Sequence, residues 1–317
     1  MIWTVIVNYR TAALVVECLR SIAAEAAALP GFRAVVVDNA SGDGSVETLA
    51  GAIEREGWRG WASVIANDRN GGFASGNNVG IREALRARVD HVLLLNPDTV
   101  ARSGAIRALS DFLDSHPQVG IAGSALENAA GGAECSAHNA PSPLGELESG
   151  ASLGLLSRAL RRHAVTPPPR DVAHECEWVS GASLMVKKEV FDSVGLLDEE
   201  YFLYFEEADF CLRARQAGWQ VWFVPASRVV HLEGASTGIA DTSRRRPRYW
   251  YDSRRRYFLK HFGAAGLVLA DALWAVGTAS LALRRFLRLG AGGNGRNPRR
   301  FALDLLWGDL RFLVTGK

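Results

Sequence analysis

Short, wholly apolar runs alternate with helical patterns over the first part of the chain, and this alternation limits the folds that the sequence can adopt. The runs at residues 35–37 and 92–95 contain no polar residue, which is typical of parallel strands covered on both faces. Between such runs, apolar residues recur at helical spacing, as at Ala105, Leu109 and Leu113. The pattern predicts an α/β fold whose mostly parallel sheet has helices on both faces.

The same reading places most of the expected elements. We expect strands at residues 2–7, 34–37, 63–66, 91–95, 119–122, 183–187 and 220–224, and a helix at about 205–217. Residues 127–175 are rich in Ala, Gly, Ser and Pro, which predicts a long surface excursion. Ser45, and either Ser75 or Asn77, are expected to cap helix starts.

Composition excludes some classes of protein. The net charge of +2 over 317 residues is nearly neutral, so no acidic partner follows from the total, and we expect no nucleic-acid partner. The four cysteines have no CxxC spacing, so we expect reduced thiols and a cytoplasmic protein. The apolar run at residues 2–7 is only of strand length, so we expect no export signal.

Asn96, Pro97 and Asp98 directly follow the apolar run at residues 92–95. In open α/β sheets, ligands bind at the carboxyl ends of the strands. The Asp98 carboxylate is suited to a divalent cation whose other ligands include diphosphate oxygens. The alternative is that Asp98 opens a helix near residues 99–103; we favour the metal role.

Two further segments follow expected strands. Asp38 and Asn39 end one strand, where the acid either caps the next turn or accepts hydrogen bonds from a nucleobase or ribose. The glycine-rich loop at residues 70–78 offers backbone amides to phosphate or sugar oxygens, unless its glycines only make a tight connection. The loop matches neither the P-loop nor the dinucleotide-binding spacing, so it does not support a nucleotide hydrolase or an NAD enzyme.

Three acids lie within four positions among aromatic residues. An ion pair with Arg213 accounts for Asp209 but not for Glu206 and Glu207. A partly desolvated glutamate has a raised proton affinity, which suits a general base near neutral pH. His231 is either a packed or surface residue, or a nitrogen ligand beside Asp98 that favours Mn²⁺ over Mg²⁺.

Trp178 precedes a turn that contains Ser180 and Gly181. A core tryptophan is the default interpretation of such a position. The alternative is that the indole stacks on the ring of an acceptor sugar.

Taken together and in order, these segments resemble the family 2 glycosyltransferases, and within them the rhamnosyltransferase-like branch. The matching segments are residues 5–9, 37–41, 70–74, 96–98, 179–182, 206–207, His231 and 234–236. The resemblance implies a GT-A fold with a Rossmann-like sheet and a nucleotide-sugar donor. It also implies Mn²⁺ or Mg²⁺ as cofactor, and inversion at the anomeric carbon by single displacement.

The resemblance also assigns roles. It implies that Asp38 binds the nucleoside, Asp98 and His231 bind the metal, and Glu207 is the base. Asn96 replaces the first acid of the DxD motif, and Glu207 replaces an aspartate, which leaves Glu206 as a substitute base. Donor contacts are implied for Val7, Asn8, Tyr9, Asp38, Asn39, Asn70, Gly72, Phe73, Asn77, Asn96, Pro97 and Asp98, and acceptor contacts for Trp178, Ser180 and Gly181.

The C-terminal region differs in character. Residues 244–260 carry eight Lys or Arg against one Asp, interleaved with aromatic residues, which suits anionic lipid headgroups. Residues 263–283 are long enough to span a bilayer, but Asp271 lies in mid-run. We therefore expect interfacial helices rather than a crossing. The alternative is that the run packs on the enzyme or on a second subunit in a homodimer.

We accordingly expect a glycosyltransferase domain at residues 1–240, with a nucleotide-binding half (1–125) and an acceptor and catalytic half (126–240). Residues 241–317 form a helical appendage. The expected reaction moves rhamnose from dTDP-rhamnose, or alternatively a sugar from a UDP-sugar, to a glycan or lipid-linked acceptor in cell-surface polysaccharide assembly. The expected location is the inner face of the cell membrane.

Two rival hypotheses stay open at this point. A non-catalytic nucleotide-sugar-binding or scaffold protein is motivated by the departures at Asn96 and Glu207. A sugar nucleotidyltransferase is disfavoured, because residues 8–11 lack the glycine-rich basic loop that such an enzyme needs.

Overall fold

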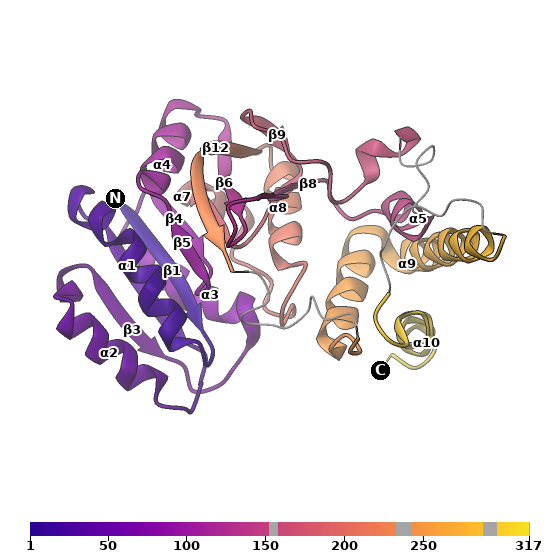
Figure 1. Cartoon of the computed structure of the whole chain (residues 1–317), viewed down its shortest axis with the longest axis horizontal. Helices are drawn as coiled ribbons and strands as arrows, with labels where there is room; N and C mark the ends of the chain where they lie inside the picture. The colour runs from indigo at the N-terminus through magenta and orange to yellow at the C-terminus, as the bar shows by residue number, and fades with distance from the viewer. Residues whose placement is uncertain (152–157, 233–242, 288–296, 317) are drawn as a thin grey trace. The chain divides into compact units, whose positions relative to one another are not determined.

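The computed structural model describes residues 1–151, 158–232, 243–287 and 297–316, and the chain divides into two compact units (Figure 1). The first unit comprises residues 1–138, 168–202 and 206–237, and the second comprises 139–167, 203–205 and 238–317. The C-terminal part of the second unit begins at residue 238, near the expected boundary at residue 240, and residues 139–167 are grouped with it. Helix α5 (Pro143–Ala151) belongs with the C-terminal region because it packs closely on α9 (Arg248–Phe286): a Cβ atom on Gly150 would lie 2.7 Å from the Trp274 carbonyl oxygen.

The first unit is built on a mixed sheet, and its main path runs β3-β2-β1-β4-β11-β6-β12-β5. The neighbours from β3 to β4 are parallel, whereas β11 runs antiparallel to both β4 and β6. The strands of this sheet are β1 (Ile2–Asn8), β2 (Arg33–Asp38), β3 (Ala62–Ala66), β4 (His91–Leu95), β5 (Thr99–Ala101), β6 (Val119–Glu127), β7 (Ala133–Glu134), β9 (His174–Cys176), β11 (Ser183–Lys187) and β12 (Gln220–His231). A separate pair consists of β8 (Ala137–His138) and β10 (Trp178–Val179).

Helices cover both faces of this sheet, as the alternation predicts. The helices of the first unit are α1 (Ala12–Ala28), α2 (Ser45–Arg55), η1 (Trp58–Gly60), α3 (Gly72–Arg86), α4 (Ala105–Ser115), α7 (Lys188–Val194) and α8 (Glu206–Gln216). One core cluster joins residues of α1, α2 and α4 to the sheet, and the other joins residues of α3, α7 and α8. Successive β4 side chains alternate between them: Leu93 and Leu95 enter the first, and Val92 and Leu94 the second.

All seven predicted strands are confirmed, and two have the predicted bounds, at residues 91–95 and 183–187. The helix near residues 99–103, which was the alternative weighed for Asp98, is not found, because residues 99–101 form strand β5 and pair with β12. The predicted helix caps are wrong. Gly44 is the N-cap of α2, and Ser45 is the first residue of that helix. Helix α3 begins at Gly72, so Ser75 and Asn77 lie inside it and do not cap it. The excursion at 127–175 contains β7, β8, α5, η2 (Arg161–His163) and β9.

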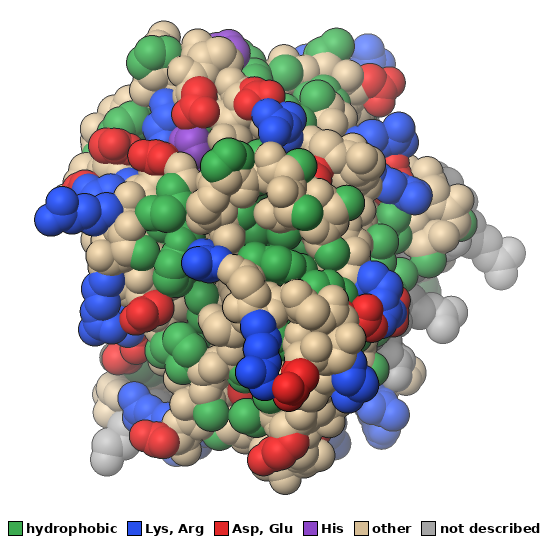
Figure 2. All heavy atoms as spheres, turned by 90° about the vertical axis from the view of Figure 1, so that its left-hand side faces the viewer, with side chains coloured by type: hydrophobic (Ala, Val, Ile, Leu, Met, Phe, Trp, Pro, Cys, Tyr) green, Lys and Arg blue, Asp and Glu red, His purple; other side chains and the backbone are tan. Residues whose placement is uncertain are grey.

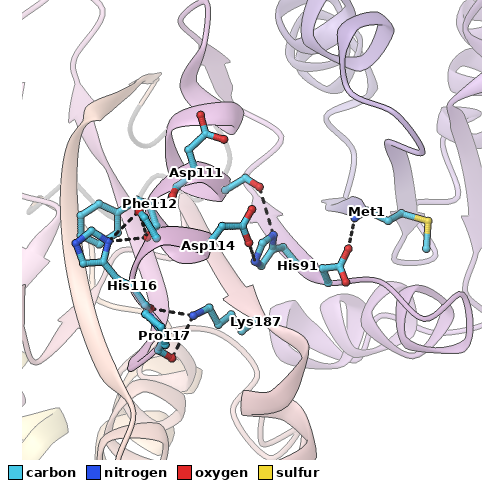
Figure 3. A network of polar contacts seen from close by, with 11 residues as sticks. Met1, His91, Asp111, Phe112, Asp114, His116, Pro117 and Lys187 are labelled. Carbon is cyan, nitrogen blue, oxygen red and sulfur yellow. Dashed lines mark hydrogen bonds and ion pairs between the residues drawn. The ribbon is translucent and has the colours of Figure 1, made fainter.

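A polar network holds the N-terminal end of β4, opposite to the edge where β4 leads into Asn96 (Figure 3). His91 is buried, and its imidazole lies 3.3 Å from an Asp114 carboxylate oxygen. At the neighbouring strand end, Lys187 Nζ donates to the carbonyl oxygens of His116 (2.9 Å) and Pro117 (3.3 Å). These polar contacts thus hold the edge of the sheet that lies opposite to the edge of the candidate site.

Charged side chains of both signs are interspersed on the face of the first unit that Figure 2 shows. No broad field of a single sign covers this face. That distribution agrees with the nearly neutral net charge of +2.

The second unit contains α5, η2, α9 and α10 (Phe301–Thr315). Helix α9 is interrupted at Gly263, whose φ of 68° is left-handed. An ion network lies inside this unit: the buried Arg254 guanidinium contacts Glu146 (3.2 Å), Asp271 (2.9 Å) and Asp309 (3.2 Å). Asp271, which sits in the middle of the apolar run, thus has a buried cationic partner.

Helix α9 is long and apolar enough to cross a membrane. Its most apolar stretch has a mean hydropathy of 1.6, and 22% of that stretch is buried within the protein. Length and composition alone support this possibility. The expected interfacial position of residues 263–283 stays a prediction.

Candidate active site

The polar residues predicted from the sequence gather at one edge of the sheet, because strand register places them there. Asn8 and Asp38 lie opposite each other at the ends of the parallel strands β1 and β2. Strand β11 is antiparallel, so its first residue, Ser183, pairs with Leu95, the last residue of β4. The loop before β11 therefore lies at the same edge as Asn96.

Asp98 and His231 lie side by side at this edge. His231 pairs with Thr99 across the antiparallel β5 and β12 strands, and its Nε2 is 3.5 Å from Asp98 Oδ1. The Asp98 side chain is 1% exposed and that of His231 is 15% exposed. Asn96 completes the group, with its Nδ2 3.5 Å from His231 Nε2. Three side chains from two strand ends thus converge on one point.

The donor set suits a hard divalent cation. Carboxylate and amide oxygens with one imidazole nitrogen are ligands that Mn²⁺ accepts. Asn96 Oδ1 is buried, and within the described residues it has no hydrogen-bond partner, which is costly unless a ligand contacts it. Among the described residues there is no group of three His, Cys, Asp or Glu placed to hold a metal. A cation held by these side chains would need further ligands, of the kind that diphosphate oxygens supply.

Glu207 lies beside the loop that precedes β11. A Cβ atom on Gly181 would lie 3.6 Å from Glu207 Oε1, and the Asn96 amide donates to the Ala182 carbonyl oxygen (3.0 Å). Burial raises the pKa of Glu207, and the backbone N–H groups of Glu207 and Gly181 offset part of that rise. Its Oε2 is buried and accepts no hydrogen bond within the described part of the chain. A carboxylate in this state is a proton acceptor.

Glu206 differs from Glu207 in burial. Glu206 is 2% exposed, whereas Glu207 is half-buried. The two residues before them, Tyr204 and Phe205, have left-handed φ values of 72° and 70°. Two consecutive non-glycine residues in this conformation are strained, and such strain concentrates at functional sites. The sequence did not indicate it. The predicted ion pair of Asp209 with Arg213 is confirmed at 2.8 Å.

Asp38 caps a turn. It is 2% exposed, and its carboxylate accepts hydrogen bonds from Asn8 Nδ2 (2.7 Å), the Ser41 hydroxyl (2.6 Å) and the Ser41 backbone N–H (3.0 Å). The interpretation of Asp38 as a residue that caps the next turn is thus confirmed. A carboxylate has about four acceptor positions, so one is left for the nucleoside contact that the resemblance implies.

The glycine-rich loop is fixed from both sides. Asn39 Nδ2 donates to the Gly72 carbonyl oxygen (2.8 Å), and the Phe73 amide donates to the Phe202 carbonyl oxygen (2.7 Å). Gly72 has a left-handed φ of 85°, and a Cβ atom there would lie 2.1 Å from that Phe202 oxygen. The Asn70 side chain accepts a hydrogen bond from the amide of Gly72 (2.9 Å), the first residue of α3.

The remaining predicted residues lie near the same edge with mostly structural contacts. Trp178 stacks on His138 (ring centroids 4.1 Å apart), so one indole face is covered. The Ser180 amide donates to the Ser136 carbonyl oxygen (2.9 Å). Val7, Asn77 and Pro97 are buried, whereas Tyr9 is 43% exposed. Their donor and acceptor roles stay predictions, and residues 234–236 lie outside the described residues.

Sequence reasoning missed Asn78. This buried helical residue donates to the Leu197 carbonyl oxygen (2.8 Å) and accepts from the Leu197 amide (3.1 Å), which fixes the segment that leads to Phe202. The available signal was the Asn77-Asn78 pair inside an amphipathic helix, where asparagine is unfavourable unless it has such a partner.

The geometry agrees with comparisons to known proteins. The chain matches the family described as "Glycosyltransferase like family 2" over residues 2–253, and it belongs to that family. The resemblance noted from the sequence is thereby confirmed.

Curated relatives include several sugar transferases. An N-acetylglucosaminyl-diphospho-decaprenol L-rhamnosyltransferase of Mycobacterium tuberculosis is 34% identical over 156 residues, which cover 47% of this chain and 49% of that protein. The hexosyltransferase Agl10 of low-salt glycan biosynthesis in Haloferax volcanii is 31% identical over 215 residues, covering 67% and 61%. The dTDP-rhamnosyl transferase RfbF of Shigella flexneri is 28% identical over 200 residues, covering 63% and 60%. The match thus spans about half of the first relative's length.

Solved structures support the fold. The mannosyltransferase PcManGT from Pyrobaculum calidifontis, in complex with GDP-Man and Mn²⁺, has a TM-score of 0.56 at 16% identity, covering 99% of this chain and 81% of that chain. GalNAc-T7, solved with UDP, GalNAc and Mn²⁺, has a TM-score of 0.58 at 16% identity, covering 98% and 57%. These likenesses show the GT-A fold, as predicted.

Proposed function

We propose that the protein is an inverting, metal-dependent glycosyltransferase that acts in cell-surface polysaccharide assembly. The favoured donor is dTDP-rhamnose, and the acceptor is a hydroxyl of a glycan or of a lipid-linked sugar. The observation that carries the proposal is the meeting of Asn96, Asp98 and His231 at one sheet edge, in a chain of this family. The names of the mycobacterial and Shigella relatives support the choice of rhamnose.

Asp98 and His231 would hold the cation, and Asn96 Oδ1 would turn toward it or toward the ribose. Mn²⁺ or Mg²⁺ bound there would neutralise the negative charge of the leaving diphosphate. The structures solved with Mn²⁺ and nucleotides support this assignment.

Glu207 would accept the proton of the acceptor hydroxyl. The new bond joins the acceptor oxygen to the anomeric carbon, while the bond to the diphosphate oxygen breaks and the diphosphate leaves with the electron pair. One such displacement inverts the anomeric configuration. The raised pKa of Glu207 and its unpartnered Oε2 support the role of base; the described residues offer that oxygen no hydrogen bond. The side chain of Glu207 is one methylene longer than the aspartate that the family usually has at this position.

The C-terminal region would bring the enzyme to the inner face of the membrane, where a lipid-linked acceptor is available. Support comes from the excess of arginine in residues 244–260 and from the apolar α9 helix. The decaprenol-linked substrate named for the mycobacterial relative fits such a location.

A donor panel tests the proposal. Release of nucleoside diphosphate is measured for dTDP-rhamnose first, and then for UDP- and GDP-sugars, with N-acetylglucosaminyl-diphospho-polyprenol as acceptor. We expect release with dTDP-rhamnose that depends on both the acceptor and Mn²⁺. Donor binding without turnover for every pair would instead identify a non-catalytic nucleotide-sugar-binding protein.

A further inference from the structure

A pocket of about 730 Å³ lies in the second unit, between the start of α9 and the helix α10. Its wall is strongly basic. Five arginines line it: Arg245, Arg246, Arg248, Arg255 and Arg311. Only two acids, Asp252 and Asp304, lie among the lining residues. The lining thus carries a net charge of +3, from five positive and two negative groups.

The acids are already engaged by three of the arginines. Arg245 forms a bidentate ion pair with Asp304. Arg248 and Arg255 both contact Asp252, and Arg255 also contacts the buried Asp309 (2.6 Å). Across the described ranges, no ion pair involves Arg246 or Arg311. Two positive charges of the pocket therefore remain for an external anion.

Two buried donors at the pocket also have no acceptor. Tyr251 is 5% exposed, and its hydroxyl makes no hydrogen bond within the part of the chain that the structure describes. The same holds for Arg246 Nε, whose guanidinium lies over the Trp250 ring (4.8 Å). Burial raises the pKa of Tyr251 to about 12, so its hydroxyl keeps its proton and remains a donor. Buried donors without acceptors are unfavourable, which indicates a ligand rich in acceptor oxygens.

An apolar face continues from the same pocket along α10. Leu303, Trp307, Leu310 and Val314 are 60%, 62%, 53% and 75% exposed. Their spacing of four, three and four residues places them on one side of the helix. Leu303 and Trp307 also line the pocket. Exposed apolar residues next to a basic pocket, with a tryptophan at the boundary, are typical of a helix that lies in a membrane interface.

We propose that this arginine pocket binds the phosphate group of an anionic membrane lipid while the apolar face of α10 enters the headgroup region. Arginine matches phosphate oxygens with paired N–H donors. The inference rests on the membrane contact included in the proposed function, and it adds the site and the headgroup chemistry. Nucleic acid shares the phosphate but does not account for the apolar face.

The experiment measures flotation of the full chain with vesicles of phosphatidylcholine, with and without phosphatidylglycerol. The pocket variant combines Arg246→Gln and Arg311→Gln, and the matched control combines Arg161→Gln and Arg299→Gln, two exposed arginines of the same unit that do not line the pocket. We expect the pocket variant to bind anionic vesicles about tenfold or more weakly, because each basic residue near an anionic surface contributes about fivefold. The control retains binding. Equal losses in both variants, or equal binding to neutral vesicles, would overturn the proposal.

Two further arms separate the sources of phosphate. Trp307→Gln is expected to weaken vesicle binding, whereas Leu144→Gln, another exposed apolar residue of this unit, is not. If inorganic phosphate or single-stranded RNA stabilises the protein against heat as much as the vesicles do, and Trp307→Gln has no effect, the lipid assignment is wrong. Arg311→Gln alone, at an exposed position, keeps the test valid if Arg246→Gln fails to fold. Sugar transfer to a water-soluble acceptor is measured in parallel with the same variants. A variant that loses vesicle binding but keeps this transfer separates a failure of lipid binding from a failure of the proposed function.

Discussion

The backbone N–H of Asn96 donates a hydrogen bond to the carbonyl oxygen of Ala182, at 3.0 Å. This contact joins the end of β4 to the loop before β11, although the two residues are far apart in the sequence. Asp98, two residues after Asn96, lies beside His231, and Gly181, directly before Ala182, lies beside Glu207. The residues of the proposed cation site and the proposed proton acceptor thus lie at one edge of one sheet.

Glu207→Gln is expected to retain donor binding and to lose transfer by about 10²–10⁴-fold, because the amide cannot accept the acceptor proton. Glu206→Gln, at the neighbouring buried carboxylate, is the matched comparison and is expected to lose less. Initial rates and calorimetric donor affinities measure both effects. A fully active Glu207→Gln enzyme would rule out this base, and selective loss in Glu206→Gln would transfer the role to Glu206.

Gly72→Ala is expected to destabilise the first unit more than Gly42→Ala does. Both glycines have left-handed φ values, which cost alanine about 1–2 kcal/mol. Only at Gly72 does the new Cβ atom meet a backbone oxygen, that of Phe202, whereas nothing lies within 4 Å at Gly42. The difference is expected to be about 1–3 kcal/mol by urea unfolding. Equal losses would show that the loop moves freely from Phe202.

Acidification is expected to weaken the first unit through His91. Burial lowers the pKa of His91 below its ordinary value of 6.5, and Asp114 and Asp90 offset part of that change. The unfolded chain therefore binds more protons than the folded chain just below pH 6.5. Stability contributed by neutral His91 is present above that pH and is lost as pH falls toward the lower folded pKa. His91→Gln removes this loss.

Thermal unfolding at several pH values measures this effect, with His174→Gln, a half-buried histidine of β9, as the matched control. The slope of stability against pH should flatten in His91→Gln only. An unchanged slope would mean that other groups dominate the acid transition.

The fold was predictable from the sequence where the signals are local. Strand runs such as residues 92–95 are apolar throughout because both faces of the strand are covered. Such a run can be recognised from the sequence without tertiary information. The antiparallel insertion of β11 was not predictable, because it pairs with strands far away in the chain. Nor was the joining of residues 139–167 to the C-terminal unit, which depends on the fit of Gly150 on α9 and on an ion pair between Glu146 and Arg254.

The site was predictable in its residue types and less so in its contacts. Each polar residue at a strand end could be named, since the carboxyl edge of a parallel sheet collects them. The convergence of Asp98 with His231 depends on the pairing of β5 with β12, and no strand was expected at residues 99–101. The sequence also gave no sign that Asn8 and Ser41 would occupy most of the Asp38 carboxylate.

Arg254→Met is expected to destabilise the second unit by about 3–5 kcal/mol, because Asp271 and Glu146 would lose their cationic partner and the buried Asp309 would keep only Arg255. Arg248→Met is the matched control, since its side chain is 87% exposed and its loss should leave the unfolding midpoint unchanged. Differential scanning calorimetry reads both variants. A stability in Arg254→Met equal to that of the wild type would mean that the network contributes no net stabilisation.

The most direct test measures the binding of Mn²⁺ in the presence of dTDP. The electron paramagnetic resonance signal of free Mn²⁺ reports how much of the ion remains unbound. Asp98→Asn is nearly isosteric, and Asp111→Asn makes the same change at an exposed position of α4. The account predicts that Mn²⁺ binding depends on the nucleotide and that the Mn²⁺ affinity is at least about tenfold lower in Asp98→Asn. Even the loss of a group that only supports a metal ligand has an effect of about this size. The Mn²⁺ affinity should be unchanged in Asp111→Asn. Equal Mn²⁺ affinity in the wild type and in a folded Asp98→Asn variant would contradict it.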